Sequence, residues 1–179
     1  MSIGREYKIV IAGSMGAGKT TAITAISDVA PVSTEVANSD QTAFAKASTT
    51  VALDYGEIAL DGGDRVRLYG APGQVRFKFM WKIVARGAIG LVLLIDNNAE
   101  TALQDLEMGL DAFDELVQKS AVVIGITHCD TGKGRPMSAY RDLLIQRSLP
   151  LPVFSIDARR RDQVLMLVDA LMHSIEAQA

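Results

Sequence analysis

The sequence is poor in features that mark secreted or membrane-spanning proteins. Cys129 is the only cysteine among 179 residues, so no intrachain disulfide can form and nothing points to an oxidising compartment. The apolar run near the N-terminus covers only Ile9 to Ala12, too short for a signal-peptide core or a membrane span. The start Met1-Ser2 lacks a myristoylation glycine, and no C-terminal prenylation cysteine follows. We therefore expect a cytoplasmic chain without an integral membrane segment.

An excess of basic residues is also missing. The net charge of -3 and the pI near 5.4 argue against nucleic acid as a partner, because nucleic-acid-binding domains usually present a basic face. The hydrophobic share of 49% and the charged share of 22% are ordinary for a globular protein. A chain of this length suits one domain with a sizeable core, and no internal repeat or linker interrupts it. We expect residues 1–179 to form a single domain.

Short apolar runs alternate with amphipathic stretches, a pattern typical of a helix-covered parallel sheet. The pattern predicts strands at Tyr7–Ala12, Val51–Leu60, Arg65–Tyr69, Ile89–Ile95, Ala121–Thr127 and Pro152–Ile156. It predicts helices at Thr20–Val29, about Arg76–Arg86, Leu103–Leu116, Ser138–Arg147 and Val164–Ile175. Residues 32–50 are polar and without periodicity, which favours a functional loop.

The turn Asp61-Gly62-Gly63-Asp64 predicts a hairpin, so its two flanking strands should run antiparallel. The expected fold is a doubly wound, three-layer α/β domain. Its sheet would have six strands, mostly parallel, with one antiparallel hairpin strand at the edge. Right-handed crossovers in such a sheet place ligand-binding loops at the carboxyl ends of the strands.

The segment from Gly13 to Thr20 reads Gly-x-x-x-x-Gly-Lys-Thr, between a predicted strand and a predicted helix. Glycines let backbone N–H groups turn toward phosphate oxygens, and the helix N-terminus adds partial positive charge. Lys19 would reach the β- and γ-phosphates, and Thr20 would offer its hydroxyl to Mg²⁺. The alternative is a plain Gly-rich turn that ends in Lys-Thr. The expected nucleotide contacts in this segment are Ser14, Met15, Gly16, Ala17, Gly18, Lys19, Thr20 and Thr21.

The order of motifs along the chain resembles the Ras-like small GTPases. This order is the phosphate loop, a long Thr-bearing loop, a hairpin, a Pro-Gly-Gln loop and Thr-x-x-Asp after a buried strand. The segments Thr50–Glu57 and Tyr69–Gln74 are most similar to a bacterial branch that includes gliding-motility (MglA-type) GTPases and predicted GTPases that accompany roadblock-domain proteins. The resemblance implies a Ras-like P-loop NTPase domain with GTP or GDP as ligand and Mg²⁺ as cofactor.

The resemblance also assigns roles near the γ-phosphate. Thr50 matches the threonine that coordinates Mg²⁺, with Thr49 as a neighbouring candidate, although both fit an ordinary Thr-rich strand start. Gly73 would offer its N–H to the γ-phosphate. Gln74 matches the glutamine that orients the attacking water, so Gln74 and Lys19 are the expected catalytic residues. Pro72-Gly73-Gln74 is also an unremarkable turn.

Two segments correspond to the base-binding loops. In Thr127-His128-Cys129-Asp130, the Asp130 carboxylate would accept two N–H donors of guanine, partners that adenine lacks. Thr127 and His128 replace the usual Asn and Lys; the threonine could brace a loop and the histidine ring could lie over the base. In Asp157-Ala158-Arg159, the N–H of Ala158 would meet the guanine oxygen. Asp130 could instead be a simple cap or turn residue.

Two residues depart from the family pattern. Gly70 stands where the family usually has an Asp that holds Mg²⁺ through water; Asp54 either compensates or is a solvated strand residue. Met15 places a large side chain where it would crowd Gln74 and an incoming arginine. No built-in arginine finger is evident, and Arg76 is an unsupported substitute. We expect slow intrinsic GTP hydrolysis, accelerated by a regulatory partner of the roadblock type.

Two alternatives to a GTPase switch with an effector stay open: a hydrolysis-poor GTP-binding scaffold, and an ATP-using P-loop enzyme. Phe77, Phe79, Met80 and Trp81 form either core or a partner surface. The run Arg159-Arg160-Arg161 is either an anion-binding patch or a solvated helix start.

Overall fold

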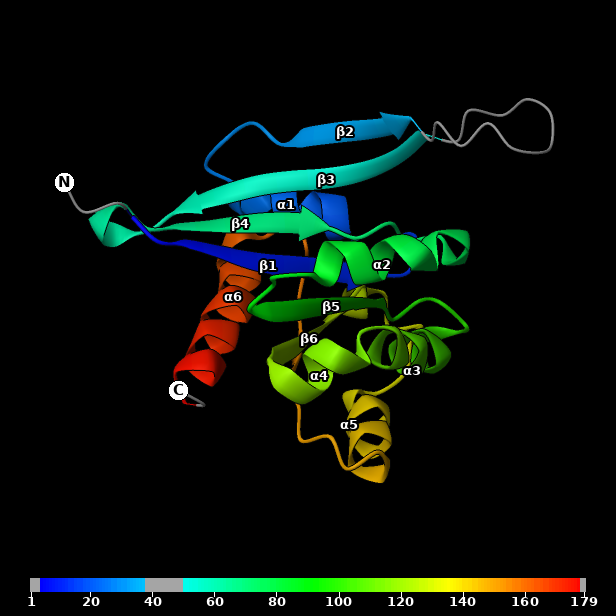
Figure 1. The fold of residues 1–179 in the computed structure, drawn as a ribbon. Coiled ribbons are helices and arrows are strands. Elements are labelled where there is room, and N and C mark those ends of the chain that lie inside the picture. Colours follow the sequence, from blue (N-terminus) through cyan, green and yellow to red (C-terminus); the bar gives the residue numbers. More distant parts are fainter. Residues whose placement is uncertain (1–3, 38–49, 178–179) are drawn as a thin grey trace.

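Seven strands form one sheet, in the order β2-β3-β4-β1-β5-β6-β7 (Figure 1). The computed structural model describes residues 4–37 and 50–177. The strands are β1 (Glu6–Gly13), β2 (Val32–Ala37), β3 (Thr50–Ala59), β4 (Arg65–Gly70), β5 (Gly90–Asp96), β6 (Ala121–Thr127) and β7 (Val153–Ser155). The helices are α1 (Lys19–Ile26), α2 (Lys78–Ala85), α3 (Ala102–Ala112), α4 (Asp114–Lys119), α5 (Met137–Gln146) and α6 (Arg161–Glu176).

The strand directions confirm an α/β fold with a mostly parallel sheet. β1 runs parallel to β4 and β5, and the parallel order continues through β6 to β7. β3 alone is reversed, pairing antiparallel with both β2 and β4. The antiparallel strand expected from the Asp61–Asp64 turn is therefore present.

Two details of the expected sheet are wrong. The sheet has seven strands rather than six, because Val32–Ala37, predicted as loop, pairs along β3 from Val32 opposite Tyr55 to Ala37 opposite Thr50. Consequently β2 is the edge strand, and the antiparallel β3 lies second from the edge. The pattern of this segment is too polar to predict a strand by itself. Pairing with the β3 backbone stabilises it, which is how tertiary context overrides local propensity.

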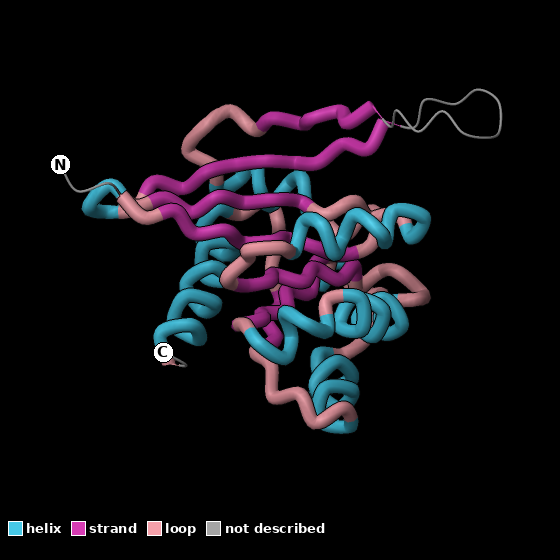
Figure 2. The backbone as a smooth tube through the Cα atoms, in the orientation of Figure 1, coloured by secondary structure: helices cyan, strands magenta, loops and turns pink. Residues whose placement is uncertain are grey.

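Helices cover both faces of the sheet (Figures 1 and 2). α1 and α6 lie on one face, where Ile23 and Ile26 join Leu167 and Leu171 in one buried cluster. α2, α3, α4 and α5 cover the other face and form a second cluster. The central strands β5 and β6 are buried along almost their whole length, as their uniformly apolar sequences predicted.

The helix expected over Leu103–Leu116 is broken into α3 and α4 at Phe113. The Phe113 ring stacks on Trp81 of α2, with centroids 5.6 Å apart and planes 12° from parallel. Trp81 also donates from Nε1 to the Pro72 carbonyl at 2.7 Å. Trp81 and Phe77 therefore belong to the core, whereas Phe79 is 54% exposed. Within the described part of the chain, no helix has the length and apolarity to cross a bilayer.

Replacing Ile124 of β6 by Ala is expected to lower the free energy of unfolding by about 2–5 kcal/mol, because the side chain is fully buried and a cavity would remain. Chemical denaturation measures the change. The matched control is Ile145→Ala on α5, where the side chain is 74% exposed and the change should stay within about 0.5 kcal/mol. Equal losses for both variants would contradict the assigned core.

Candidate functional site

The turn from β1 into α1 has a backbone that only glycine adopts easily. Gly13, Gly16 and Gly18 have φ values of 148°, 86° and 92°. A Cβ on Gly13 would lie 2.1 Å from the Leu94 carbonyl oxygen, and one on Gly18 would lie 2.9 Å from the Ala158 Cβ. All three positions favour glycine by conformation, and the chain geometry also leaves no room for a side chain at Gly13 and Gly18.

Several amide groups of this turn are unpaired among the described residues. Among hydrogen bonds between described residues, the N–H groups of Met15, Gly16, Gly18 and Lys19 donate to no acceptor, whereas Ala17 donates to the Ser14 carbonyl at 3.2 Å. The Oγ of Ser14 is likewise buried without a partner in this part of the chain. Unpaired donors at a helix N-terminus are suited to a phosphate, because they add to the positive end of the helix dipole.

Lys19 lies inside this turn with only 9% of its surface exposed. Its Nζ donates to the Ser14 carbonyl at 2.8 Å, which closes the turn around the side chain. Burial lowers the pKa of Lys19 to about 8, and the negative charge of Asp54 opposes part of this shift. A desolvated ammonium with one neutral acceptor has unused capacity to bind an anion.

Thr127 braces the turn from the end of β6. Its buried hydroxyl lies 3.1 Å from the Ala17 carbonyl oxygen and 3.2 Å from that of Ile95. One hydroxyl has one proton, so it donates to either carbonyl at a time. Thr127 therefore links the phosphate loop to β5, which confirms the interpretation that it braces the loop.

Of the two predicted metal ligands, Thr20 and Thr50, the structure describes the side chain of Thr20 alone. Thr20, at the start of α1, donates its hydroxyl proton to Oδ2 of Asp54 at 2.5 Å. Thr50 is the first residue of β3, opposite Ala37, but its side chain lies outside the described part. Thr49 lies outside the described residues altogether, so its suggested role stays a prediction.

The loop after β4 meets the phosphate loop at Gly73. A Cβ on Gly73 would lie 2.6 Å from Nζ of Lys19 and 2.7 Å from the backbone N of Met15. The backbone of Gly73 therefore packs directly against the turn where phosphates would bind. Such close approach explains why glycine occupies this position.

The side chains expected to act or interfere beside Gly73 lie at the surface. Gln74 is exposed and its side chain makes no hydrogen bond within the described residues. Met15, which was expected to crowd Gln74, is 72% exposed. The guanidinium carbon of Arg76 lies 4.7 Å from the centre of the Phe77 ring. The cation therefore stacks on the ring of the next residue.

A cavity of about 650 Å³ separates the two predicted base-binding segments. Gly18 and Thr21 line it as well, so it opens onto the phosphate loop. Asp130 lies in a short 3₁₀ turn, and its side chain is 72% exposed. The Ala158 side chain is buried against Gly18. The structure thus brings the segments at 127–130 and 157–159 to one cavity.

Charged groups organise the walls of this cavity. The Arg159 guanidinium and backbone N–H donate to the Asp157 carboxylate and lower its pKa to about 2. The same guanidinium lies 3.8 Å from Oδ2 of Asp130, so it stands between the two segments. His128, which also lines the cavity, adopts a left-handed backbone with φ of 57°.

Asp96 is a site residue that sequence analysis missed. Its Oδ1 lies 3.0 Å from Nδ1 of His128 and accepts the Asn98 N–H at 2.9 Å. The His128 ring is therefore held at the end of β5 by Asp96, which lies opposite Thr127 in the sheet register. Asp96 directly follows the buried apolar run Ile89–Ile95, and that placement could have identified it.

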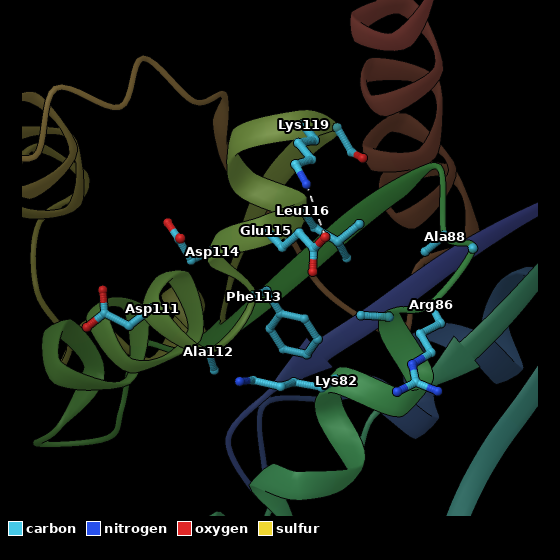
Figure 3. Close-up of a pocket in the computed structure, with 13 residues that line it drawn as sticks. Lys82, Arg86, Ala88, Asp111, Ala112, Phe113, Asp114, Glu115, Leu116 and Lys119 are labelled. Carbon is cyan, nitrogen blue, oxygen red and sulfur yellow. Dashed lines mark hydrogen bonds and ion pairs between the residues drawn. The ribbon is translucent and has the colours of Figure 1, made fainter.

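A second hollow of about 700 Å³ lies between α2 and the α3–α4 junction (Figure 3). Its walls carry Lys82 and Arg86 on one side and the side chains of Asp114 and Glu115 on the other. Gly87 and Ser120 line it, residues at the amino ends of β5 and β6. This hollow therefore lies near the amino ends of β5 and β6, whereas the turn from Gly13 to Thr20 follows the carboxyl end of β1. It does not belong to the candidate site.

Comparisons with known proteins give little information on function. No family model matches the chain. The chain is similar to an uncharacterized protein of the archaeon Methanocaldococcus jannaschii, with 26% identity over 103 residues, which covers 58% of this chain and 59% of that protein. The similarity thus spans about three fifths of the length of the relative.

The buried ammonium predicts a specific pH dependence of stability. Because the Lys19 pKa is lowered from 10.5 to about 8, the cost of burying its charge is fully present below pH 8 and disappears as the pH rises toward 10.5. The ligand-free protein should therefore gain up to about 3 kcal/mol of unfolding free energy across this window, relative to Lys19→Met. Urea denaturation of both proteins on either side of the window measures the difference.

The exposed Lys82→Met variant is the control, and its difference from the unaltered protein should stay nearly constant with pH. A Lys19→Met difference that is also constant would show that the ammonium is not desolvated.

Proposed function

We propose that the protein is a Ras-like P-loop GTPase switch that hydrolyses GTP slowly with Mg²⁺. One observation carries the proposal: Gly73 lies so close to the turn that a Cβ on it would be 2.6 Å from Nζ of Lys19 and 2.7 Å from the Met15 N. A γ-phosphate held by the loop from Gly13 to Thr20 would thus meet the Pro-Gly-Gln loop as well. Residues 1–179 act as one such domain in this proposal.

The phosphate-binding residues fit a triphosphate that carries a divalent cation. The free amide donors and Lys19 provide the positive field, and the glycines let phosphate oxygens approach the backbone. Ser14 contributes a buried hydroxyl without a partner among the described residues. Such a surface favours an anion with several oxygens over a neutral ligand.

The oxygen donors beside the turn from Gly13 to Thr20 suit a Mg²⁺ ion that is held mainly by phosphates and water. No group of three or more His, Cys, Asp or Glu in the described ranges could hold a metal. In nucleotide sites, Mg²⁺ usually needs only one or two protein oxygens, with phosphates and water as the other ligands. Thr20 and Asp54 offer two hard oxygens 2.5 Å apart beside the phosphate loop, so these residues fit Mg²⁺. Bound Mg²⁺ would neutralise charge on the phosphates, and Thr50 is the second threonine proposed to hold it.

The cavity walls favour guanine over adenine. The Asp130 carboxylate is exposed toward solvent rather than consumed by a helix cap, and the Arg159 guanidinium lies 3.8 Å from its Oδ2. A carboxylate can accept both N–H groups on the Watson–Crick edge of guanine, whereas adenine offers it no such pair. The Ala158 N–H, beside Gly18, is proposed to donate to the guanine oxygen.

The chain supplies binding and orientation for hydrolysis but lacks a placed arginine. Lys19 neutralises phosphate charge, the Gly73 N–H holds the γ-phosphate, and Gln74 orients the attacking water. Arg76 is occupied on the Phe77 ring. An arginine supplied by a partner is worth about 10³–10⁵ in rate. We therefore propose slow intrinsic turnover in the cytoplasm, accelerated by a roadblock-type regulatory protein, with a separate effector that recognises the GTP-bound state.

A GTP-binding scaffold that barely hydrolyses GTP is the second candidate. It is favoured by the Gln74 side chain, which has no described partner to fix its orientation, and by the engagement of Arg76 with Phe77.

Labelled GDP and ADP distinguish the guanine-binding proposal from an ATP-using enzyme. The unaltered protein should bind GDP more tightly than ADP in an equilibrium titration. Asp130→Ala should weaken GDP binding about 10- to 100-fold, because two charge-assisted hydrogen bonds are lost, while ADP binding changes little. Asp142→Asn removes the same charge from the exposed face of α5 and should leave both affinities unchanged. Equal affinity for GDP and ADP in the unaltered protein would contradict a guanine site.

Phosphate release distinguishes the switch from the scaffold. Gln74→Ala should lower the single-turnover rate of GTP hydrolysis about 10²-fold through loss of water positioning, with GTP affinity retained. Gln104→Ala, an exposed glutamine on α3, is the matched control. If the unaltered protein releases no phosphate above the buffer background, with or without Mg²⁺, the scaffold is the better description.

A further inference from the structure

A continuous groove runs between α2 and the pair of helices α3 and α4. The hollow of about 700 Å³ at the α3–α4 junction shares Lys82, Asp111 and Ala112 with a hollow of about 620 Å³ between α2 and α3, so the two form one surface feature. We call it the α2–α3 groove. Beneath it, the stacked rings of Trp81 and Phe113 tie α2 to the α3–α4 junction.

The α2 wall of the groove is basic. Lys78, Lys82 and Arg86 recur every four residues and line the groove, so they form one stripe along the helix. All three are exposed, and within the described ranges their side chains form no hydrogen bond or ion pair. The sequence has no acidic residue between Asp64 and Asp96, so nothing on this helix neutralises the stripe.

The opposite wall is acidic. Four carboxylates of α3 and α4 line it: Asp105, Asp111, Asp114 and Glu115. Asp111 and Glu115 pair with Arg147 and Lys119, both outside the basic stripe. In the part of the chain that the structure describes, no ion pair joins the two walls (Figure 3). Because the facing charges do not neutralise each other, a guest between them can pair with both walls.

The groove suits a guest of helical shape. Half-buried Ala85, Met108 and Ala112 also line it, so part of its surface is apolar. From Lys78 to Arg86 the stripe extends about 12 Å along α2, slightly more than two turns of a helix. A helix that packs nearly along α2 presents its own side chains at the same four-residue spacing.

We infer that the α2–α3 groove binds an amphipathic helix of a partner protein. The helix carries acidic residues four apart against Lys78, Lys82 and Arg86, basic residues toward α3 and α4, and an apolar edge between them. Charge complementarity selects this partner over an anionic membrane, because the carboxylates of α3 and α4 would repel lipid phosphates. The groove shares no residue with the turn from Gly13 to Thr20, so helix binding does not depend on nucleotide binding.

The probe is a fluorescein-labelled synthetic helix of about 18 residues, long enough to be helical by itself. It has three glutamates four residues apart, lysines on the opposite flank and leucines between them. Fluorescence anisotropy with the full chain should show saturable binding. A peptide of the same composition, with its glutamates scattered around the helix, should bind at least about 10-fold more weakly.

Lys82→Glu should weaken binding of the matched peptide about 10- to 100-fold, because it places like charges opposite each other. Arg141→Glu, the same charge change at an exposed position of α5, is the control and should leave binding unchanged. A peptide whose central glutamate is replaced by lysine should bind Lys82→Glu more tightly than the unaltered chain. If Lys82→Glu does not fold, Lys78→Glu and the terminal glutamate give the same exchange.

Equal binding of the matched and scattered peptides, or no rescue by the exchange, would overturn the inferred partner. Binding to phosphatidylserine vesicles in place of the matched peptide, lost in Lys82→Glu, would assign the basic stripe to a lipid surface and would also overturn it. A dimer of the chain that Lys82→Glu disrupts, without peptide binding, would assign the groove to a second copy. If the chain binds the matched peptide but no GDP or GTP, the groove stands and only the proposed function is wrong.

Discussion

The burial of the Lys19 ammonium is the constraint on which the site depends. The side chain is almost fully enclosed by its own turn, and the Ser14 carbonyl is its acceptor at 2.8 Å. Desolvation of a cation is unfavourable, and nearby amide donors that point into the same space add to the positive potential. A polyanion would satisfy both at once. The local fold is therefore organised around a charge that the described side chains balance only in part.

The neighbouring elements either support this turn or complement its charge. Thr127 holds the Ala17 carbonyl from β6, and Gly73 brings the loop after β4 against Lys19. Asp54 is the one carboxylate whose charge raises the Lys19 pKa against the effect of burial. These residues come from β3, the loop after β4 and β6, so the pairing order of the sheet brings them together.

Sequence patterns predicted the elements that are set by local chemistry. The Gly-x-x-x-x-Gly-Lys-Thr turn and the uniformly apolar β5 and β6 are where the pattern placed them, because glycine conformations and full burial leave direct traces in sequence. β2 was missed because its pairing partner, β3, is what makes it a strand. The break at Phe113 was missed because it depends on the Trp81 ring across the interface. The link from Asp96 to His128 likewise depends on register between β5 and β6, which one sequence does not reveal.

The relation between Asp54 and Gly70 shows how two residues far apart in sequence can share one region of space. Residues opposite each other on paired strands reach nearly the same point, so a functional group can come from either strand if the other provides room. Glycine at 70 is then a requirement of aspartate at 54, since a Cβ would lie 3.0 Å from the Asp54 Cβ. The two positions therefore constrain each other's side chains, which the sequence of β4 alone does not reveal. The physical question is whether a carboxylate reaches the Thr20 hydroxyl, and in this fold it does so from β3.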